Sequence, residues 1–215
     1  KVRVGLSESV VFTRIMQSPA LTDSELSSAI RWEAEQHIPI PLTEVYLDYT
    51  VLTRPEKGVK EGQMEILLVA AKQSIVSKLV DLVESTQLEL VAIDTCLLSA
   101  VRALSAPQDP PTLVFHSGAT STDFAVISDG RIALTHSIST AGASFTRAIE
   151  SELSLPTAQA EQYKQAYGLK PKALDGKVRK ALTGLIRTVL SEAKHSTAAF
   201  ESTHRGKQIQ RVILS

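Results

Sequence analysis

Strand-like and helix-like hydrophobic patterns alternate along this chain, and this alternation constrains its fold more than any other feature. Residues 45–51 place apolar side chains at every second position, and residues 64–71 form a continuous apolar run. These patterns are typical of a half-buried and a fully buried strand, whereas residues 26–34 and 75–83 repeat at the spacing of a helix. Because interleaved strands and helices pack as layers around one core, the sequence predicts an α/β fold.

A proline-rich stretch divides the chain into two parts. Residues 106–111 contain three prolines and few apolar side chains, which is typical of a linker, so we predict a domain boundary there. In the second part, Asp129-Gly130 is a strong signal for a two-residue hairpin turn. The segments predicted there are strands at 113–115, 122–127, 131–136 and 209–214, and helices at 143–153, 157–167 and 177–200.

Local signals place several boundaries in the first part. Thr22 and Glu25 have the spacing of a capping box, and Pro39 ends the helix that follows them. Asp94 is placed to cap a later helix. We predict a strand at residues 9–16, and residues 54–62, which hold Pro, Gly and several charges, as an exposed hairpin loop.

Composition argues against several classes of function. Lys and Arg together number 23, and so do Asp and Glu, so no net charge draws the chain to nucleic acid or to an anionic membrane. No apolar run reaches the roughly 18 residues that span a bilayer. Cys96 is the one cysteine and lies in an apolar run, which predicts a buried thiol in a reducing, cytoplasmic setting. The histidines lack the paired spacing of a metal site: His37, His116, His136, His195 and His204.

The stretch between two predicted strands at residues 117–122 is the first candidate binding site. A tight turn with a glycine and several hydroxyls can present backbone N–H groups and side-chain donors to an anion such as phosphate. The alternative is a plain hairpin that uses small residues for its turn. The candidate phosphate ligands are Ser117, Gly118, Ala119, Thr120 and Ser121.

Two downstream features strengthen the phosphate interpretation. Gly142 directly precedes a predicted helix start at Ala143, and helix N-termini attract anions. Glu161 and Lys164 lie three residues apart, so they share one face of a helix. They could form a surface ion pair or hold two ribose hydroxyls. No glycine-rich nucleotide fingerprint and no serine nucleophile motif occurs.

Together these segments resemble the actin, Hsp70 and sugar-kinase superfamily, which has a ribonuclease H-like fold. The resemblance implies that residues 117–122 are the second phosphate hairpin of that fold. Glu161 and Lys164, followed by Tyr167-Gly168, are similar to the adenosine-binding helix of FtsA-like and MreB-like proteins.

A longer motif narrows the resemblance to the PilM-like proteins of type IV pilus assembly. Residues 31–41, RWEAEQHIPIP, and residues 44–49, EVYLDY, look very like the corresponding PilM segment. The resemblance implies that residues 22–90 form an inserted FtsA-like α/β subdomain. It assigns residues 1–21 and 91–106 to the first actin-like lobe and residues 111–215 to the second, and we expect the chain to be truncated at both ends.

The resemblance also implies a role. We expect a cytoplasmic scaffold that binds the N-terminal tail of a PilN-like protein in a groove between the actin-like core and the inserted subdomain, with Trp32 as a candidate contact or a core residue. It would reach the inner membrane through this and other pilus platform partners, and it would bind no nucleic acid.

The nucleotide site implied by the resemblance is degenerate. His116 occupies the position where the superfamily carries an aspartate that holds metal-bound water, and imidazole is a poor ligand for hydrated Mg²⁺. We therefore expect ATP and Mg²⁺ at most in the full-length protein, none in this piece, no catalytic residues and little ATPase activity. The alternatives are an FtsA-like division protein, the nucleotide-free cytoplasmic domain of a type II secretion platform protein, and a small-molecule kinase.

Overall fold

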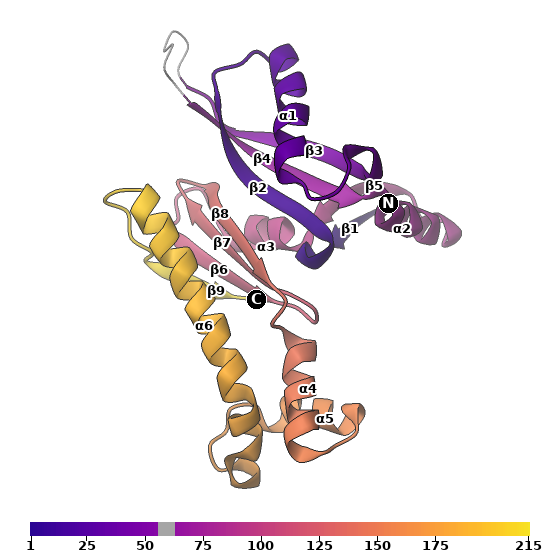
Figure 1. Cartoon of the computed structure of the whole chain (residues 1–215), viewed down its shortest axis with the longest axis vertical. Coiled ribbons are helices and arrows are strands. Elements are labelled where there is room, and N and C mark those ends of the chain that lie inside the picture. The colour runs from indigo at the N-terminus through magenta and orange to yellow at the C-terminus, as the bar shows by residue number, and fades with distance from the viewer. Residues whose placement is uncertain (56–62) are drawn as a thin grey trace.

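The structure is a computed structural model and describes residues 1–55 and 63–215. Figure 1 shows the inserted sheet with helix α1 at one end, a second sheet in the middle, and a helical arm at the other end. Residues 56–62 of the loop predicted at 54–62 lie outside the described residues. The predicted α/β organisation is present, with strands and helices alternating along the chain.

The first lobe consists of a two-stranded parallel sheet and two helices. Strand β1 (Val2–Leu6) pairs with β5 (Leu90–Thr95), and the helices are α2 (Gln73–Ser85) and α3 (Cys96–Leu104). The prediction that Asp94 caps α3 was wrong. Thr95 is the N-cap, because its hydroxyl accepts from the Leu98 amide at 3.1 Å, whereas Asp94 is the penultimate residue of β5.

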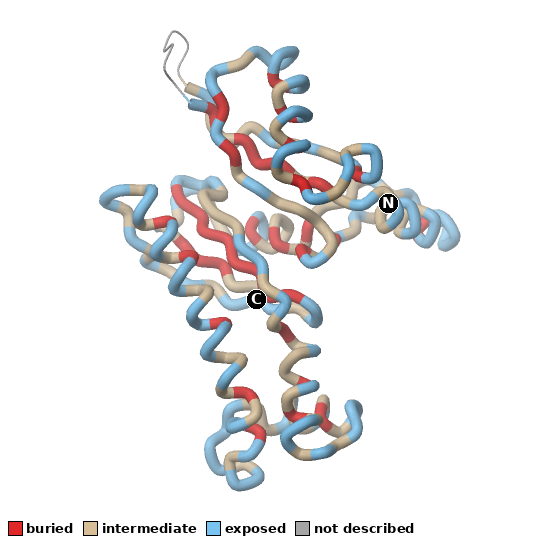
Figure 2. Tube along the Cα trace, in the orientation of Figure 1, coloured by how far each residue is buried: buried red, intermediate tan, exposed pale blue. Residues whose placement is uncertain are grey.

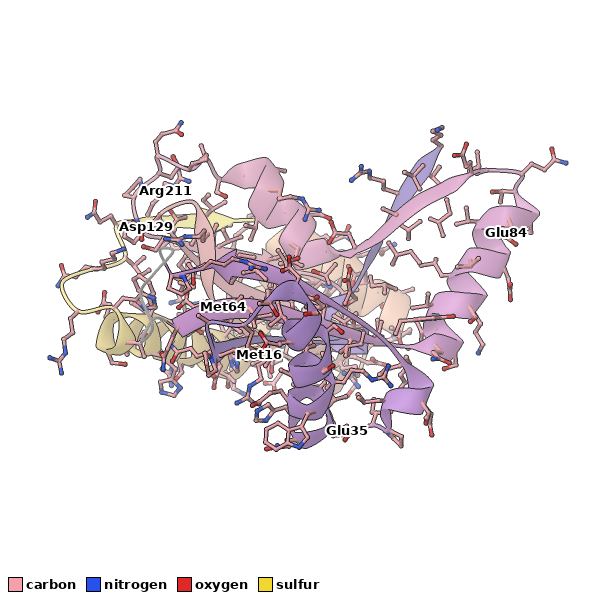
Figure 3. All side chains as sticks on the ribbon, turned by 90° about the horizontal axis from the view of Figure 1, so that it is seen from above. Met16, Glu35, Met64, Glu84, Asp129 and Arg211 are labelled. Carbon is pink, nitrogen blue, oxygen red and sulfur yellow. The ribbon has the colours of Figure 1, made fainter. Side chains whose placement is uncertain are left out.

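The inserted subdomain is an antiparallel sheet with one helix on its face. Strands β2 (Val11–Pro19), β4 (Gln63–Lys72) and β3 (Val45–Thr53) lie in the order β2-β4-β3, and η1 (Glu8–Val10) and η2 (Leu42–Glu44) are short 3-10 turns. Helix α1 (Asp23–His37) buries Leu26, Ile30 and Ala34 against the sheet. Met16 and Met64 belong to the same core and lie close together in Figure 3, where Glu35 lies at the outer part of α1.

Helix α1 begins and ends where the sequence predicts. The Thr22 side chain accepts from the Glu25 amide and the Glu25 carboxylate accepts from the Thr22 amide, so the capping box is confirmed. Pro39 keeps Ile38 out of helical geometry, with φ −87° and ψ 120°, because the proline ring would clash with a helical residue before it.

The boundary predicted between residues 21 and 22 does not follow the sheets. We assigned residues 1–21 to the first lobe, but all nine residues of β2 pair with β4, from Val11 opposite Ala71 to Pro19 opposite Gln63. Strand β2 therefore belongs to the inserted sheet. The resemblance was drawn from residues 31–49 and gave no strand pairing for residues 11–19, because pairing is a contact between segments distant in the sequence.

The second lobe is a four-stranded sheet in the order β8-β7-β6-β9, with helices on both faces. Its strands are β6 (Thr112–Ser117), β7 (Thr122–Ser128), β8 (Arg131–Ile138) and β9 (Arg211–Leu214). Alternate residues of β7 point to opposite faces: Ala125 and Ile127 contact α3, and Phe124 and Val126 pack with residues of α6 (Lys177–Thr203). Strand β7 is therefore buried on both sides.

A helical arm extends from this sheet. It contains α4 (Gly142–Leu153), α5 (Thr157–Tyr167), the 3-10 turn η3 (Ala173–Gly176) and the first turns of α6. A separate small core holds it together: Ile149, Ala160, Val178 and Leu182. Figure 2 shows that the end of the arm is mostly exposed.

Candidate functional site

A groove runs between the inserted subdomain and the first lobe. It has a volume of about 270 Å³. Its lining comes from β3 and β4 on one side and from β5 and α3 on the other, and its apolar side chains include Leu67, Val69, Ile93 and Leu98. This is the location where the PilM resemblance places a partner peptide.

The backbone edge of β3 opens into this groove. Five consecutive residues of β3, 46–50, line it, although alternate side chains of a strand point to opposite faces. Gln73 Nε2 donates to the Val45 carbonyl at 3.2 Å, and the Tyr49 amide donates to its neighbour Asp48 at 2.8 Å. These groups are therefore turned away from β4, and by alternation Leu47 also turns its amide and carbonyl outward.

Charged groups flank the apolar lining. The Asp94 carboxylate forms an ion pair with Arg102 and also accepts from the Thr95 amide at 2.8 Å. Asp48 and the half-exposed Tyr46 lie at the β3 side. An apolar floor with a few polar groups at its rim can bind an extended peptide and fix its direction.

The hairpin predicted at residues 117–122 is present between β6 and β7. The Gly118 amide donates to the Ser121 carbonyl at 2.9 Å and closes the turn. Most of its hydroxyls already have partners: Ser117 Oγ lies 3.3 Å from Thr122 Oγ1, Thr120 Oγ1 lies 3.3 Å from Ser9 Oγ, and Ser121 Oγ donates to Asp123 Oδ2 at 3.0 Å. Within the described residues, the amides of Ala119 and Thr120 donate to no backbone or side-chain acceptor.

The start of α4 is occupied by the same hairpin. The Gly142 amide donates to the Gly118 carbonyl at 3.1 Å, and the Ala143 amide donates to the Ala119 carbonyl at 2.8 Å. These are the first amides of the helix, the groups that an anion would use. These two amides of the helix N-terminus therefore bind the hairpin and are not available to an anion. A Cβ at Gly142 would lie 3.2 Å from the Gly118 oxygen, so this close approach favours glycine.

Glu161 and Lys164 form the ion pair that the sequence left as one of two alternatives. Their side chains are 2.7 Å apart, and Lys164 Nζ also donates to the Gly142 carbonyl at 3.0 Å. Thr146 Oγ1 donates to Glu161 at 2.5 Å. Hydrogen bonds from Lys164, Thr146 and Gln165 lower the pKa of Glu161 to about 2. The structure thus brings Gly118, Ala119, Gly142, Glu161 and Lys164 into one cluster.

His116 is the penultimate residue of β6 and directly precedes Ser117, where the hairpin begins. It pairs in register with Asp123, and its Nδ1 lies 3.2 Å from Ser215 Oγ. Asp123 itself is buried and accepts from Ser121 and Ser137. The carboxylate opposite His116 is therefore already engaged by two hydroxyl donors.

The local donor set fits a phosphate group better than a metal ion. The amides of Ala119 and Thr120 are suitable partners for a phosphate oxygen, whereas Lys164 Nζ already donates to Gly142, Thr146 and Glu161 and contributes its positive charge alone. Hydrated Mg²⁺ prefers oxygen ligands, and the imidazole of His116 does not supply them. Across residues 1–55 and 63–215, no group of three His, Cys, Asp or Glu side chains is arranged to hold a metal ion.

Trp32 is not a core residue, since its exposed fraction is 62%. It lies on α1, which packs with Met64, Ile66 and Leu68 of β4, whereas the groove is lined by Leu67, Val69 and Ala71. Since these sets alternate along β4, Trp32 and the groove are on opposite sides of the sheet.

The groove residues were missed by sequence reasoning. Leu67 and Val69 look like ordinary strand residues, and only the packing of β4 beside β5 and α3 shows that their face is open. The repeat of apolar side chains on both faces of β4 was the one available signal, because it predicts contact on both sides of the strand.

The chain matches one protein family along its whole length. The family model described as type IV pilus assembly protein PilM matches residues 1–215. A solved structure of a PilM-PilN type IV pilus biogenesis complex is 25% identical and superposes with a TM-score of 0.85, covering 99% of this chain and 61% of that one. The chain thus spans less than two thirds of the length of the matched chain of that complex. The expected actin-like α/β fold is confirmed.

Two further solved structures are less similar to this chain. MreB5 of Spiroplasma citri bound to AMPPNP is 21% identical, with a TM-score of 0.46 and coverage of 66% of this chain and 54% of that one. The cytoplasmic domain of EpsL, an inner membrane component of the type II secretion system of Vibrio cholerae, is 11% identical, with a TM-score of 0.45 and coverage of 72% and 56%. In the part of the chain that is described, no helix is long and apolar enough to cross a membrane.

Proposed function

Since this chain belongs to the PilM family of type IV pilus assembly proteins, we propose that it is a cytoplasmic scaffold that binds the N-terminal tail of a PilN-like protein. Its place at the inner membrane would then come from that partner and from other proteins of the pilus platform. The observation that carries the proposal is the groove beside β3, in a chain that superposes on a PilM solved in complex with PilN.

The groove suits an extended peptide. A peptide strand placed beside β3 would pair with the outward backbone groups of Leu47 and add a strand to the sheet. Its alternate side chains would meet the apolar lining formed by Val69, Ile93 and Leu98. The Asp94–Arg102 ion pair at the rim offers both charges to the polar residues of a tail.

The first test is a titration of a fluorescent PilN N-terminal tail, followed by anisotropy, with a scrambled peptide as control. We expect saturable binding of the native order only. Leu98→Lys should weaken this binding at least about tenfold, because the half-buried Leu98 would be covered by the peptide, full burial of a leucine contributes about 1.5–3 kcal/mol, and the lysine adds a charge to an apolar site. Trp32→Ala is the matched control and should leave the affinity unchanged, since Trp32 is across the sheet.

Two results would contradict the proposal. Equal binding of the scrambled tail would show that the groove does not read a sequence. Loss of binding in Trp32→Ala with normal binding in Leu98→Lys would move the tail to the exposed face of α1. Thermal unfolding of both variants establishes that each is folded at the temperature of the titration.

We further propose that the full-length protein binds ATP with one of its phosphate groups at the 118–121 turn. We expect it to hydrolyse this ATP very slowly. The amides of Ala119 and Thr120, which donate to no acceptor among the described residues, support the binding part, and the positive charge of Lys164 lies close to Gly142 beside this turn. The imidazole of His116 supports the second part, because it does not supply the oxygen ligand that a hydrated magnesium ion prefers, and the opposite carboxylate of Asp123 already accepts from Ser121 and Ser137. The nucleotide would then serve as a structural ligand between the lobes.

A further inference from the structure

The end of the helical arm carries an unusual concentration of positive charge. Residues 169–180 contain five Lys or Arg residues and one acidic residue, Asp175, although the whole chain is neutral. We call Lys170, Lys172, Lys177 and Arg179, together with Leu169 and Leu174, the basic tip. All six residues are exposed.

The positive charge of the tip is largely uncompensated. Lys180 pairs with Glu152 at 2.7 Å, and Glu150 accepts a hydrogen bond from Thr157. Within the described residues, the four cations of the tip form no ion pair. Positive potential therefore extends from this end of the molecule over about one Debye length, roughly 8–10 Å at moderate salt.

Helix stability does not explain these cations. The first turn of α6 contains Lys177 and Arg179 and no acidic residue. Helix N-termini favour Asp and Glu, because the helix dipole already places positive charge there. The cations at this position add to the dipole instead of compensating it.

Two leucines lie exposed among these charges. The exposed fractions are 49% for Leu169 and 39% for Leu174. The arm has its own apolar core around Val178 and Leu182, but neither leucine belongs to it. Leu174 even has φ +50°, a conformation that leucine rarely adopts, without gaining a buried position.

We propose that the basic tip binds the surface of a membrane that contains anionic lipid. Lysines attract acidic headgroups at about fivefold in affinity per charge, and exposed leucines enter the boundary between headgroups and acyl chains. The tip ends a projecting arm, so it can reach a flat surface without a clash from either sheet (Figure 1). A double-stranded nucleic acid would bind the cations but offers no apolar surface for the two leucines to enter. The leucines therefore favour a lipid surface.

The inference is independent of the groove. The tip is built from α5, η3 and α6, and the groove from β3, β4, β5 and α3. Loss of tail binding would therefore leave the tip proposal intact, and the reverse also holds.

The test is co-sedimentation of the protein with phosphatidylcholine vesicles that either contain or lack phosphatidylglycerol. We expect binding only to the anionic vesicles, and less binding as the salt concentration rises. The variant Lys170→Gln/Lys172→Gln should bind about 25-fold more weakly, as expected for two lost charges. The matched control is Lys78→Gln/Lys194→Gln, which removes two exposed, unpaired cations elsewhere and should bind normally.

A second variant separates lipid from a general attraction for anions. Leu174→Asn keeps every charge, and asparagine tolerates positive φ, so the fold is preserved. We expect weaker binding to anionic vesicles and unchanged binding to a DNA duplex. Equal binding to neutral vesicles, equal loss in the control variant, or full binding of Leu174→Asn would each overturn the proposal.

Discussion

At the scale of single residues, Glu8 is the side chain whose environment is most at odds with its charge. It lies in η1 with an exposed fraction of 7%, where β2 of the inserted sheet meets β8 of the second lobe. Thr13 Oγ1 donates to Glu8 Oε2 at 3.1 Å, but Oε1 has no partner among the described residues. His136 and Ser137 line the same small cavity, of about 170 Å³.

Burial raises the pKa of Glu8, and the nearby charge of Asp123 adds to this, while the hydrogen bond from Thr13 partly offsets it. A carboxyl whose pKa is higher in the folded than in the unfolded protein favours folding while it is protonated. Its contribution is complete below the unfolded pKa and is lost as the pH rises through the folded pKa.

We therefore expect Glu8→Gln to stabilise the protein at neutral pH and to have little effect at acid pH. The neutral amide removes the cost of a buried charge, about 1 kcal/mol or a few degrees in Tm. Thermal unfolding followed by circular dichroism between pH 4 and pH 8 measures this (the range brackets the ordinary carboxyl value of about 4.5). A Tm difference that does not grow with pH would show that Glu8 remains protonated or hydrated throughout.

His116 carries the proposal for the nucleotide. In the full-length protein, we expect His116→Asp to make ATP binding depend on Mg²⁺, because a carboxylate is a suitable ligand for a hydrated magnesium ion. Calorimetry with and without Mg²⁺ measures this, and tail binding should not change. His195→Asp on α6 alters the charge in the same way at an exposed site and is the control. Rapid ATP hydrolysis by the wild type, unaffected by His116→Asp, would place His116 outside the metal site.

At the scale of elements, the β7–β8 hairpin shows how a turn residue connects two segments distant in sequence. Asp129 and Gly130 both have positive φ, 54° and 69°, as a tight two-residue hairpin requires. A Cβ on Gly130 would lie 2.8 Å from the Pro107 Cα, so the turn packs directly on the linker. At the same end, Lys207 pairs with Asp129, and Arg211 pairs with Asp109 at 2.6 Å; Figure 3 shows Asp129 and Arg211 close together.

We expect Gly130→Ala to destabilise the protein by about 1–3 kcal/mol, because it combines an unfavourable φ with a backbone clash. The control is Gly184→Ala in α6, where a new Cβ meets nothing within 4 Å. Alanine has a higher helix propensity, so this control should be stabilising by up to about 1 kcal/mol. Chemical denaturation measures the free energy of unfolding of both variants. An unchanged value for Gly130→Ala would mean that the linker moves away at little cost.

At the scale of the whole molecule, stability and binding are distributed over separate cores. The inserted sheet with α1 has one core, the second lobe has one on each face of its sheet, and the arm has a small core of its own. The groove lies where the inserted sheet meets the first lobe, and the basic tip lies at the far end of the arm (Figure 1). A scaffold gains from this arrangement, because a partner in the groove and a surface at the tip can be bound together.

The sequence by itself determined the elements and the family. Thr22, Glu25 and Pro39 set the ends of α1, and Asp129-Gly130 set a hairpin, because capping and turn geometry depend on neighbouring residues alone. The 31–41 motif identified the PilM family for the same reason, since a motif is read from consecutive residues.

Only the tertiary structure decided which surfaces remain available. It placed β2 in the inserted sheet, directed the first amides of α4 to Gly118 and Ala119, and left Trp32 on the side of the sheet opposite the groove. Each of these depends on contacts between residues far apart in the sequence. A hydrogen-bond donor is free for a ligand only if no distant part of the chain has already reached it, and no local pattern contains that information.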